Sequence, residues 1–200
     1  MALAGIHSHR DIRAAARLRP HAAFMRMALM VLFACGAMAR PAAAEPDTNG
    51  IKADMLCNMA KFVQWPDAVV AQNKGQLVVT ILGEDELAGT LANVLSQRNV
   101  NGKPVFVRFA RRVQDVHGSQ IVYIAASEMT HAEQILAALK GTPVLTLSDV
   151  EGFAAKGGMM DFSGVAPHLR FEVSLARAES AGLRISSKLL VIAKVVDGTP

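Results

Sequence analysis

The segment Leu77-Val78-Val79-Thr80-Ile81-Leu82-Gly83 decides the fold class, because it has the pattern of a short buried β-strand ended by a glycine. Residues 84–95 follow with an amphipathic pattern, and their first acidic side chains suit a helix amino terminus. Further strands are predicted at 104–109, 120–125 and 143–147, with a helical turn at 113–116 and a helix at 128–139. Strands that alternate with helices through short connections predict a mainly parallel sheet.

The carboxyl-terminal third departs from this alternation. Residues 159–163 and 169–173 are strand-like and are separated by Gly164 and Pro167, which predicts a hairpin. Helices are predicted at 149–156, 175–181 and 188–196, the first and last capped by serines. We therefore expect an α/β, three-layer fold, in which a mainly parallel sheet has helices on both faces and an antiparallel edge hairpin.

A helix is also expected at 51–64, where apolar residues recur at three- and four-residue spacing. Trp65-Pro66 would end it, because a residue before proline avoids helical backbone. Residues 45–50 (EPDTNG) are polar and turn-rich, and we interpret them as a linker. The expected organisation is a leader at 1–44, this linker, and a single domain at 51–196.

The leader has the order of a secretory signal. Arg26 precedes an apolar run at 27–39, and the small residues 42–44 follow Pro41, so cleavage is expected after Ala44. The run is too short to span a bilayer comfortably. These features predict an exported, periplasmic protein.

Two alternatives concern the same leader. The segment before Met25 is long and rich in arginine, which makes Met25 or Met27 a candidate for the true start. A lipoprotein-type cleavage would leave Cys35 acylated, although the large Phe33 suits such a signal poorly.

The positive charge of the chain belongs to the leader. Residues 1–44 hold six arginines and one aspartate, whereas residues 45–200 hold 15 Lys and Arg against 16 Asp and Glu. The domain therefore has no electrostatic reason to bind phosphate backbones, and we expect no nucleic-acid partner.

The domain offers few groups for chemistry. Gly83 to Gly89 matches neither a dinucleotide fingerprint nor a P-loop, and the acidic side chains between them would repel an anion. The histidines His117, His131 and His168 have no His or Cys at metal-ligand spacing, and no serine stands in a nucleophile elbow. We expect no catalytic residues, no metal and no cofactor. A hydrolase, the remaining enzymatic alternative, would need a serine or aspartate clustered with a histidine.

Cys57 is the single cysteine after the leader, so it has no partner for an internal disulfide. It lies in an apolar helical pattern, which predicts a buried thiol. An intermolecular disulfide is the alternative.

An ordered set of motifs gives the chain a resemblance to a known family. The motifs are Phe62-Val63-Gln64-Trp65-Pro66, Ile81-Leu82-Gly83-Glu84-Asp85, Val100-Asn101-Gly102-Lys103-Pro104-Val105, Ile124-Ala125-Ala126-Ser127-Glu128, Leu145-Thr146-Leu147-Ser148-Asp149, Leu169-Arg170-Phe171-Glu172-Val173 and Ile185-Ser186-Ser187-Lys188-Leu189-Leu190. In this order they resemble the YfiR-like family of periplasmic proteins, over about residues 51–196.

The resemblance implies a regulator that binds the periplasmic domain of an inner-membrane diguanylate cyclase and lowers cyclic di-GMP synthesis. It also implies a homodimer and an OmpA-like outer-membrane lipoprotein that sequesters the inhibitor. Trp65, His168 and Arg170 are carried over as candidate partner contacts. Two departures stand out: the family's internal cysteine pairs are missing here, and Ser174 replaces a frequent asparagine.

A second hypothesis is a periplasmic sensor domain for a small ligand. In parallel α/β sheets ligands bind beyond the carboxyl ends of the strands. Gly83, Ser127 and Ser148 follow or end three such strands, and they are the candidate ligand-binding residues.

Overall fold

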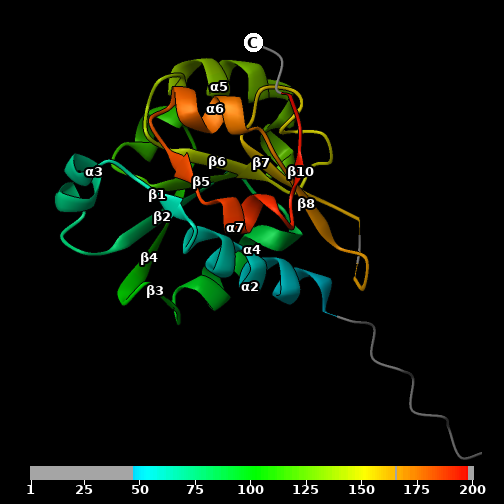
Figure 1. The fold of residues 1–200 in the computed structure, drawn as a ribbon, viewed down its shortest axis with the longest axis horizontal. Helices are drawn as coiled ribbons and strands as arrows, with labels where there is room; N and C mark the ends of the chain where they lie inside the picture. The colour runs from blue at the N-terminus through cyan, green and yellow to red at the C-terminus, as the bar shows by residue number, and fades with distance from the viewer. Residues whose placement is uncertain (1–46, 165, 198–200) are drawn as a thin grey trace, which may run out of the picture. The chain divides into compact units, whose positions relative to one another are not determined.

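The computed structural model describes residues 47–164 and 166–197. Within these residues one sheet has eight strands in the order β10-β8-β7-β6-β5-β2-β4-β3 (Figure 1). The strands are β2 (Leu77–Leu82), β3 (Asn99–Val100), β4 (Lys103–Ala110), β5 (Ile121–Ile124), β6 (Leu145–Ser148), β7 (Met160–Ser163), β8 (Arg170–Val173) and β10 (Lys194–Val195).

The middle of the sheet is parallel. β2 pairs in parallel with β4 and β5, and β6 pairs in parallel with β5 and β7. These strands point the same way, so the sheet has an amino edge, where they begin, and a carboxyl edge, where they end. β7 and β8 form the predicted antiparallel hairpin. The hairpin is not outermost, because β10 pairs in parallel with the far side of β8.

Side chains alternate across the sheet and build two separate cores. In β5, Ile121 and Tyr123 belong to one core, whereas Val122 and Ile124 belong to the other. The first core includes buried side chains of α2 (Thr48–Ala60), α4 (Glu86–Leu95) and α7 (Ser187–Leu190). The second includes those of η1 (Val113–Val116) and α5 (Ala132–Leu139). The α/β, three-layer fold with a mainly parallel sheet is therefore confirmed.

The first predicted helix is shifted toward the amino terminus. α2 begins at Thr48 because the Asp47 side chain accepts a hydrogen bond from the Gly50 backbone N–H. It ends at Ala60, and the chain then forms β1 (Val63–Gln64), which pairs antiparallel with β9 (Arg184–Ile185). The prediction of helix up to Gln64 was wrong, because Val63 and Gln64 pair with the distant strand β9 instead of continuing the helix.

Three other predicted helices also differ. Residues 188–196 divide into the short helix α7 and strand β10, because β10 gains backbone bonds to β8. Residues 149–156 form turns, because their backbone bonds to side chains of neighbouring strands, as when Ala154 N–H donates to Asp161. Residues 128–139 divide into a 3-10 helix, η2 (Ala126–His131), and α5. Further helices are α3 (Asp67–Gln72) and α6 (Leu175–Ser180).

Candidate functional site

The carboxyl edge brings Gly83 and Ser127 into contact. The Ser127 Oγ accepts a hydrogen bond of 2.9 Å from the Glu84 backbone N–H. Gly83 has a φ of +85°, and a Cβ built there would lie 2.6 Å from that oxygen. Only glycine fits this close approach, which explains the break after β2.

Ser148, the third candidate ligand-binding residue, is fully buried at the end of β6. Its hydroxyl donates to the Ile124 carbonyl at 2.8 Å and accepts from the Val150 N–H at 3.2 Å. The Ser148 hydroxyl therefore uses both its donor and an acceptor site on backbone groups of the same protein. A ligand contact by Gly83, Ser127 and Ser148 stays a prediction, and it would require these internal hydrogen bonds to be exchanged.

Asp85 organises the same edge, although its sequence position indicated only a favourable first helical turn. Its carboxylate accepts hydrogen bonds from the Ala88 N–H at 2.8 Å, the Tyr123 hydroxyl at 2.7 Å and the Ala126 N–H at 2.8 Å. Burial and the bond to Asp85 raise the pKa of Tyr123, so its hydroxyl stays a donor. The aspartate joins α4, β5 and η2.

An ion pair lies beside this cluster. The Lys52 ammonium of α2 donates to the Asp149 carboxylate, which follows β6. Lys52 is buried, at 8% exposure. A buried lysine in an apolar helix gives no signal in the sequence for its partner, which lies almost a hundred residues later. Lys52 and Asp149 thus neutralise each other, and the hydrogen bonds of Asp85 hold the neighbouring elements together.

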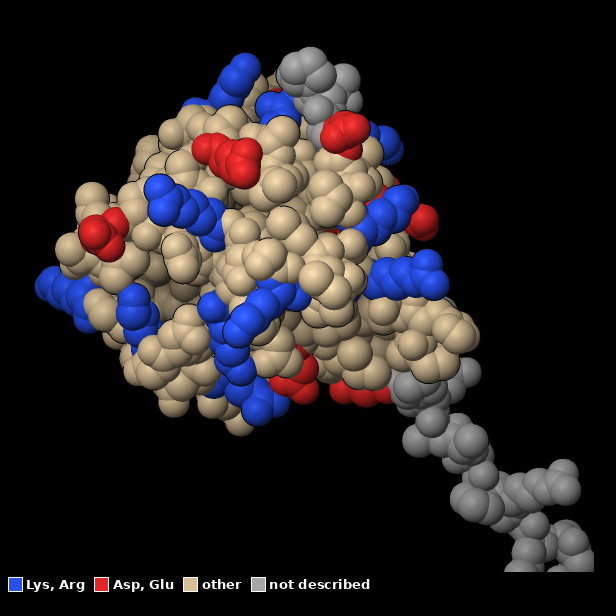
Figure 2. All heavy atoms as spheres, viewed as in Figure 1, with Lys and Arg blue, Asp and Glu red and all other residues tan. Residues whose placement is uncertain are grey.

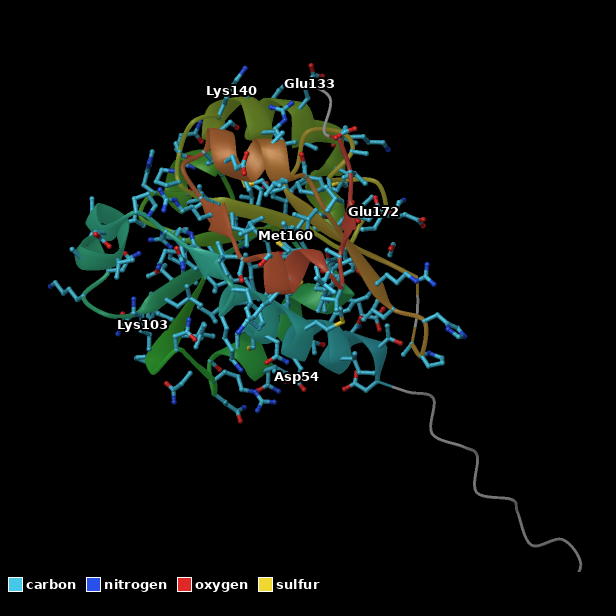
Figure 3. All side chains as sticks on the ribbon, in the orientation of Figure 1. Asp54, Lys103, Glu133, Lys140, Met160 and Glu172 are labelled. Carbon is cyan, nitrogen blue, oxygen red and sulfur yellow. The ribbon has the colours of Figure 1, made fainter. Side chains whose placement is uncertain are left out.

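A second buried carboxylate lies on the hairpin. Asp161 is fully buried, and its Oδ2 accepts from the Ala154 N–H at 2.8 Å. Burial, with the nearby Glu172 and Glu151 charges, raises its pKa to about 6. Glu172 lies opposite Asp161 in the register of β7 and β8, and it accepts a bond of 2.6 Å from Lys194 of β10 (Figure 3).

The three candidate partner contacts occupy two places. His168 and Arg170 are exposed on the β7–β8 hairpin, at the carboxyl edge. Trp65 lies at the amino edge, half-buried, and its indole Nε1–H donates to the carbonyl of Gln120 at 3.0 Å, directly before β5. The structure therefore brings His168 and Arg170 together and places Trp65 apart from them.

Beside the hairpin lies an exposed apolar surface that the sequence reading missed. Val191, Ile192 and Val195 are 83%, 67% and 49% exposed, and we call them the carboxyl-terminal apolar surface. Lys194 and Val195 pair with Glu172 and Val173 of β8, whereas Val191 and Ile192 lie in the turn between α7 and β10. The predicted apolar helix at 188–196 would have buried these side chains, whereas in the structure Leu189 is buried and Val191, Ile192 and Val195 are exposed.

A cavity of about 330 Å³ lies at the amino edge, between α3, η1 and α5. Its apolar lining includes Val69, Val113, Val116, Leu139 and Val144, and its polar lining includes Gln72, Gln114 and His117. It lies away from Gly83, Ser127 and Ser148.

Cys57 is a buried free thiol in α2, as predicted. Burial raises its pKa, which opposes thiolate formation. Over residues 47–164 and 166–197, no group of three or more His, Cys, Asp or Glu side chains is placed to hold a metal ion. In the same residues, no helix has the length and apolar character needed to cross a membrane. The leader, with Cys35 and the candidate starts, lies outside the described residues.

A comparison with protein families agrees with these observations. The family model described as YfiR/HmsC-like matches residues 49–194. The match runs from the first turn of α2 to the start of β10, and so includes both cores, the hairpin and most of the carboxyl-terminal segment.

Proposed function

The chain belongs to the YfiR/HmsC-like family, and from this premise we propose that it represses an inner-membrane diguanylate cyclase by direct contact in the periplasm. The family membership supports a periplasmic regulator of cyclic di-GMP signalling that has no catalytic step of its own. Contact with the cyclase's periplasmic domain, homodimer formation, and sequestration by an OmpA-like lipoprotein are the finer parts of the proposal.

The carboxyl-terminal apolar surface carries the proposal. Half of the six large exposed apolar side chains of the described residues fall within residues 191–195. A contiguous exposed apolar patch with a polar rim is typical of a protein-binding surface. Arg170 and His168 on the adjoining hairpin supply that rim, and arginine is frequent among the residues that dominate binding energy.

The mechanism would be a shift between two states of the cyclase. A repressor that binds the inactive arrangement more tightly than the active one moves the population toward it, in proportion to the difference in affinity. Removal of the repressor by a competing partner would release the cyclase. The pairing of β10 with β8 and the bond from Lys194 to Glu172 hold one end of this surface against the hairpin, and a surface held in place loses little freedom on binding.

The test measures cyclic di-GMP in the native host. We expect a rise when the gene is deleted and a return to the original level when the exported protein is restored. The double variant Val191→Glu and Ile192→Glu should fail to restore it, because two carboxylates in an apolar contact remain without partners. Ala137→Glu, an exposed position on α5, is the matched control and should restore it fully.

Two outcomes would overturn different parts of this proposal. Full restoration by the double variant, at equal periplasmic abundance and melting temperature, would show that the carboxyl-terminal apolar surface does not contact the cyclase. An unchanged cyclic di-GMP level on deletion would contradict the proposal that the protein represses a cyclase. His168→Ala with Arg170→Ala tests the hairpin in the same assay, and we expect partial loss of repression.

Trp65 is proposed as a separate contact, because it lies at the other edge of the sheet. Trp65→Phe removes the Nε1 donor to Gln120 and keeps an aromatic ring at the position. If repression depends on Trp65, this variant should raise cyclic di-GMP without lowering the melting temperature by more than a few degrees.

A second candidate function, the small-ligand sensor, is favoured by the cavity at the amino edge. Its volume of about 330 Å³ suits a small and largely apolar molecule. A ligand that binds the native state raises the melting temperature. A thermal-shift screen should give hits for the wild type that disappear in Ala138→Phe, which fills the cavity. Hits that persist in this variant would place the ligand elsewhere.

A further inference from the structure

The long strand β4 has an open edge. β2 pairs with it along one side over residues 105–110. On its other side β3 pairs only with Lys103 and Pro104. Among the described residues no strand follows β3 in the sheet, so the rest of β4 faces outward (Figure 1).

The backbone groups at this edge can be assigned. The Val105 N–H donates to the Arg98 carbonyl at 3.2 Å, on the side away from β2. Ala110 faces the opposite way, since its carbonyl accepts from the Gly83 N–H at 3.3 Å, next to β2. Neighbouring residues of a strand direct their backbone groups to opposite sides. Val107 and Phe109 therefore present their N–H and C=O groups at the open edge, which we call the β4 edge.

Between Val105 and Ala110, inside the flanking Pro104 and Arg111, the β4 edge lacks the usual protection against strand pairing. Natural edges carry outward charges, prolines or bulges that prevent another strand from adding. Here Phe106 and Phe109 are 51% and 64% exposed on the two faces of the strand. The central charge, Arg108, turns back into the molecule, where its Nε donates to Thr80 at 2.7 Å and an Nη donates to Ser119 at 2.9 Å.

We propose that the β4 edge binds an extended, acidic segment of a partner protein by strand addition. Main-chain hydrogen bonds to Val107 and Phe109 would give affinity, as in other strand-addition complexes. A hollow of about 350 Å³ lies on the neighbouring face of the sheet, where Phe106 and Arg108 line it together with Val78 of β2. This surface is separate from the carboxyl-terminal apolar surface, and the inference does not depend on the identity of the cyclase.

The positive charge around the β4 edge favours an acidic segment over a second copy of the chain as the added strand. Residues 103–112 hold Lys103, Arg108, Arg111 and Arg112 and no acidic side chain. Arg112 is paired with Asp115, but Lys103 and Arg111 form no ion pair within the described residues. In an antiparallel pair of identical strands each amino end meets the other's carboxyl end, so cations would face cations. Figure 2 shows Lys and Arg side chains spread over the face that the view presents, and Lys103 marks the start of β4 (Figure 3).

The test uses amide hydrogen exchange measured by NMR on the full exported protein. The probe is the synthetic peptide acetyl-Glu-Val-Glu-Phe-Glu-Val-amide, and the comparison peptide has lysine in place of glutamate. We expect the acidic peptide to slow exchange of the Val107 and Phe109 amides at least tenfold, and the lysine peptide to bind at least tenfold more weakly. Val107→Pro should abolish binding, because it removes an outward N–H and no bond to β2.

Val107→Ala is the matched control, because it removes the same side chain and keeps the N–H; it should bind the acidic peptide. Unchanged exchange at saturating acidic peptide would overturn the proposal, as would equal binding of both peptides. Amides of Val107 and Phe109 that are already protected in a dimeric sample without peptide would assign the edge to a second copy and also overturn it. If Val107→Pro does not fold, the wild-type exchange data decide.

Discussion

At the scale of single residues, the least expected feature is the buried carboxyl of Asp161. Its Oδ2 is used by the Ala154 N–H, while its Oδ1 is buried without a hydrogen-bond partner. Desolvation disfavours the charged form, and Glu172 across the hairpin adds repulsion. Asp161 therefore holds the turn at Ala154 in place, and the free energy that its burial costs increases as the carboxyl becomes charged at higher pH.

The pKa of Asp161 predicts how stability changes with pH. The folded pKa of about 6 lies above the ordinary value of 3.8. Between these values the unfolded carboxyl is charged and the folded one is protonated, so this residue's contribution to stability falls as pH rises through about 4 to 6. Asp161→Asn keeps the acceptor for Ala154 and removes the charge. At pH 7.5 it should raise the free energy of unfolding by about 1–3 kcal/mol.

Urea denaturation of both proteins at several pH values between 4.5 and 7.5 measures this difference. The variant should lose part of the decline in stability with pH that the wild type shows. Asp197→Asn, an exposed aspartate, is the control and should change neither the slope nor the stability. Identical slopes for Asp161→Asn and wild type would contradict the assignment of a raised pKa.

At the scale of elements, one aspartate fastens three of them. Asp85 caps α4 and also holds the hydroxyl of Tyr123 in β5 and the backbone at Ala126. The sequence pattern placed Asp85 in the first turn of a helix from residue 84, whereas the helix begins at Glu86 and Asp85 is its amino-terminal cap. The other two bonds depend on β2 and β5 lying side by side, which only the sheet pairing provides.

Removing this carboxylate should be strongly destabilising. Asp85→Ala leaves the buried Tyr123 hydroxyl and two backbone N–H groups without their acceptor, so we expect a loss of about 2–4 kcal/mol. Tyr123→Phe should cost about 1 kcal/mol, and the double variant should cost less than the sum of the two. Chemical denaturation checks this, with Glu84→Ala as an exposed control. Additive effects would show that the bond between Asp85 and Tyr123 contributes little.

At the scale of the whole molecule, the sheet carries two exposed surfaces of different kinds, one made of apolar side chains and one made of unpaired backbone groups. The carboxyl-terminal apolar surface lies beside the hairpin, and the β4 edge lies at the opposite end of the strand order. Two separate surfaces allow a regulator to contact one partner while another displaces it or binds alongside. Residues 45–200 carry a nearly balanced charge, so specificity must come from local patches.

Export is a property of the whole chain and can be tested directly. We expect mass spectrometry of the periplasmic protein to show an amino terminus at Glu45, because small residues precede it after an apolar run. A membrane-bound form with an acylated amino-terminal Cys35 would contradict this and favour the lipoprotein alternative. A control with Arg26 and the apolar run deleted should stay in the cytoplasm.

The sequence by itself determined the parallel core. β2, β4, β5 and β6 are short runs of β-branched and apolar residues with glycine, proline or polar residues at or near their ends, and this local pattern predicts a buried strand. The hairpin, α4 and the buried state of Cys57 followed from equally local signals. His168 and Arg170 lie two residues apart, so their common place on the hairpin also follows from local sequence.

Only the tertiary structure decided the rest. β1, β9 and β10 are two-residue strands that exist because a distant partner offers backbone hydrogen bonds, and no local pattern can report such a partner. The same holds for Lys52 with Asp149 and for the roles of Asp85. The exposed Val191 and Ile192 looked like core residues, because hydrophobicity predicts burial until the fold places a residue outside. The carboxyl-terminal apolar surface and the β4 edge, with the contacts proposed for them, therefore depend on pairing between strands that are distant in the sequence.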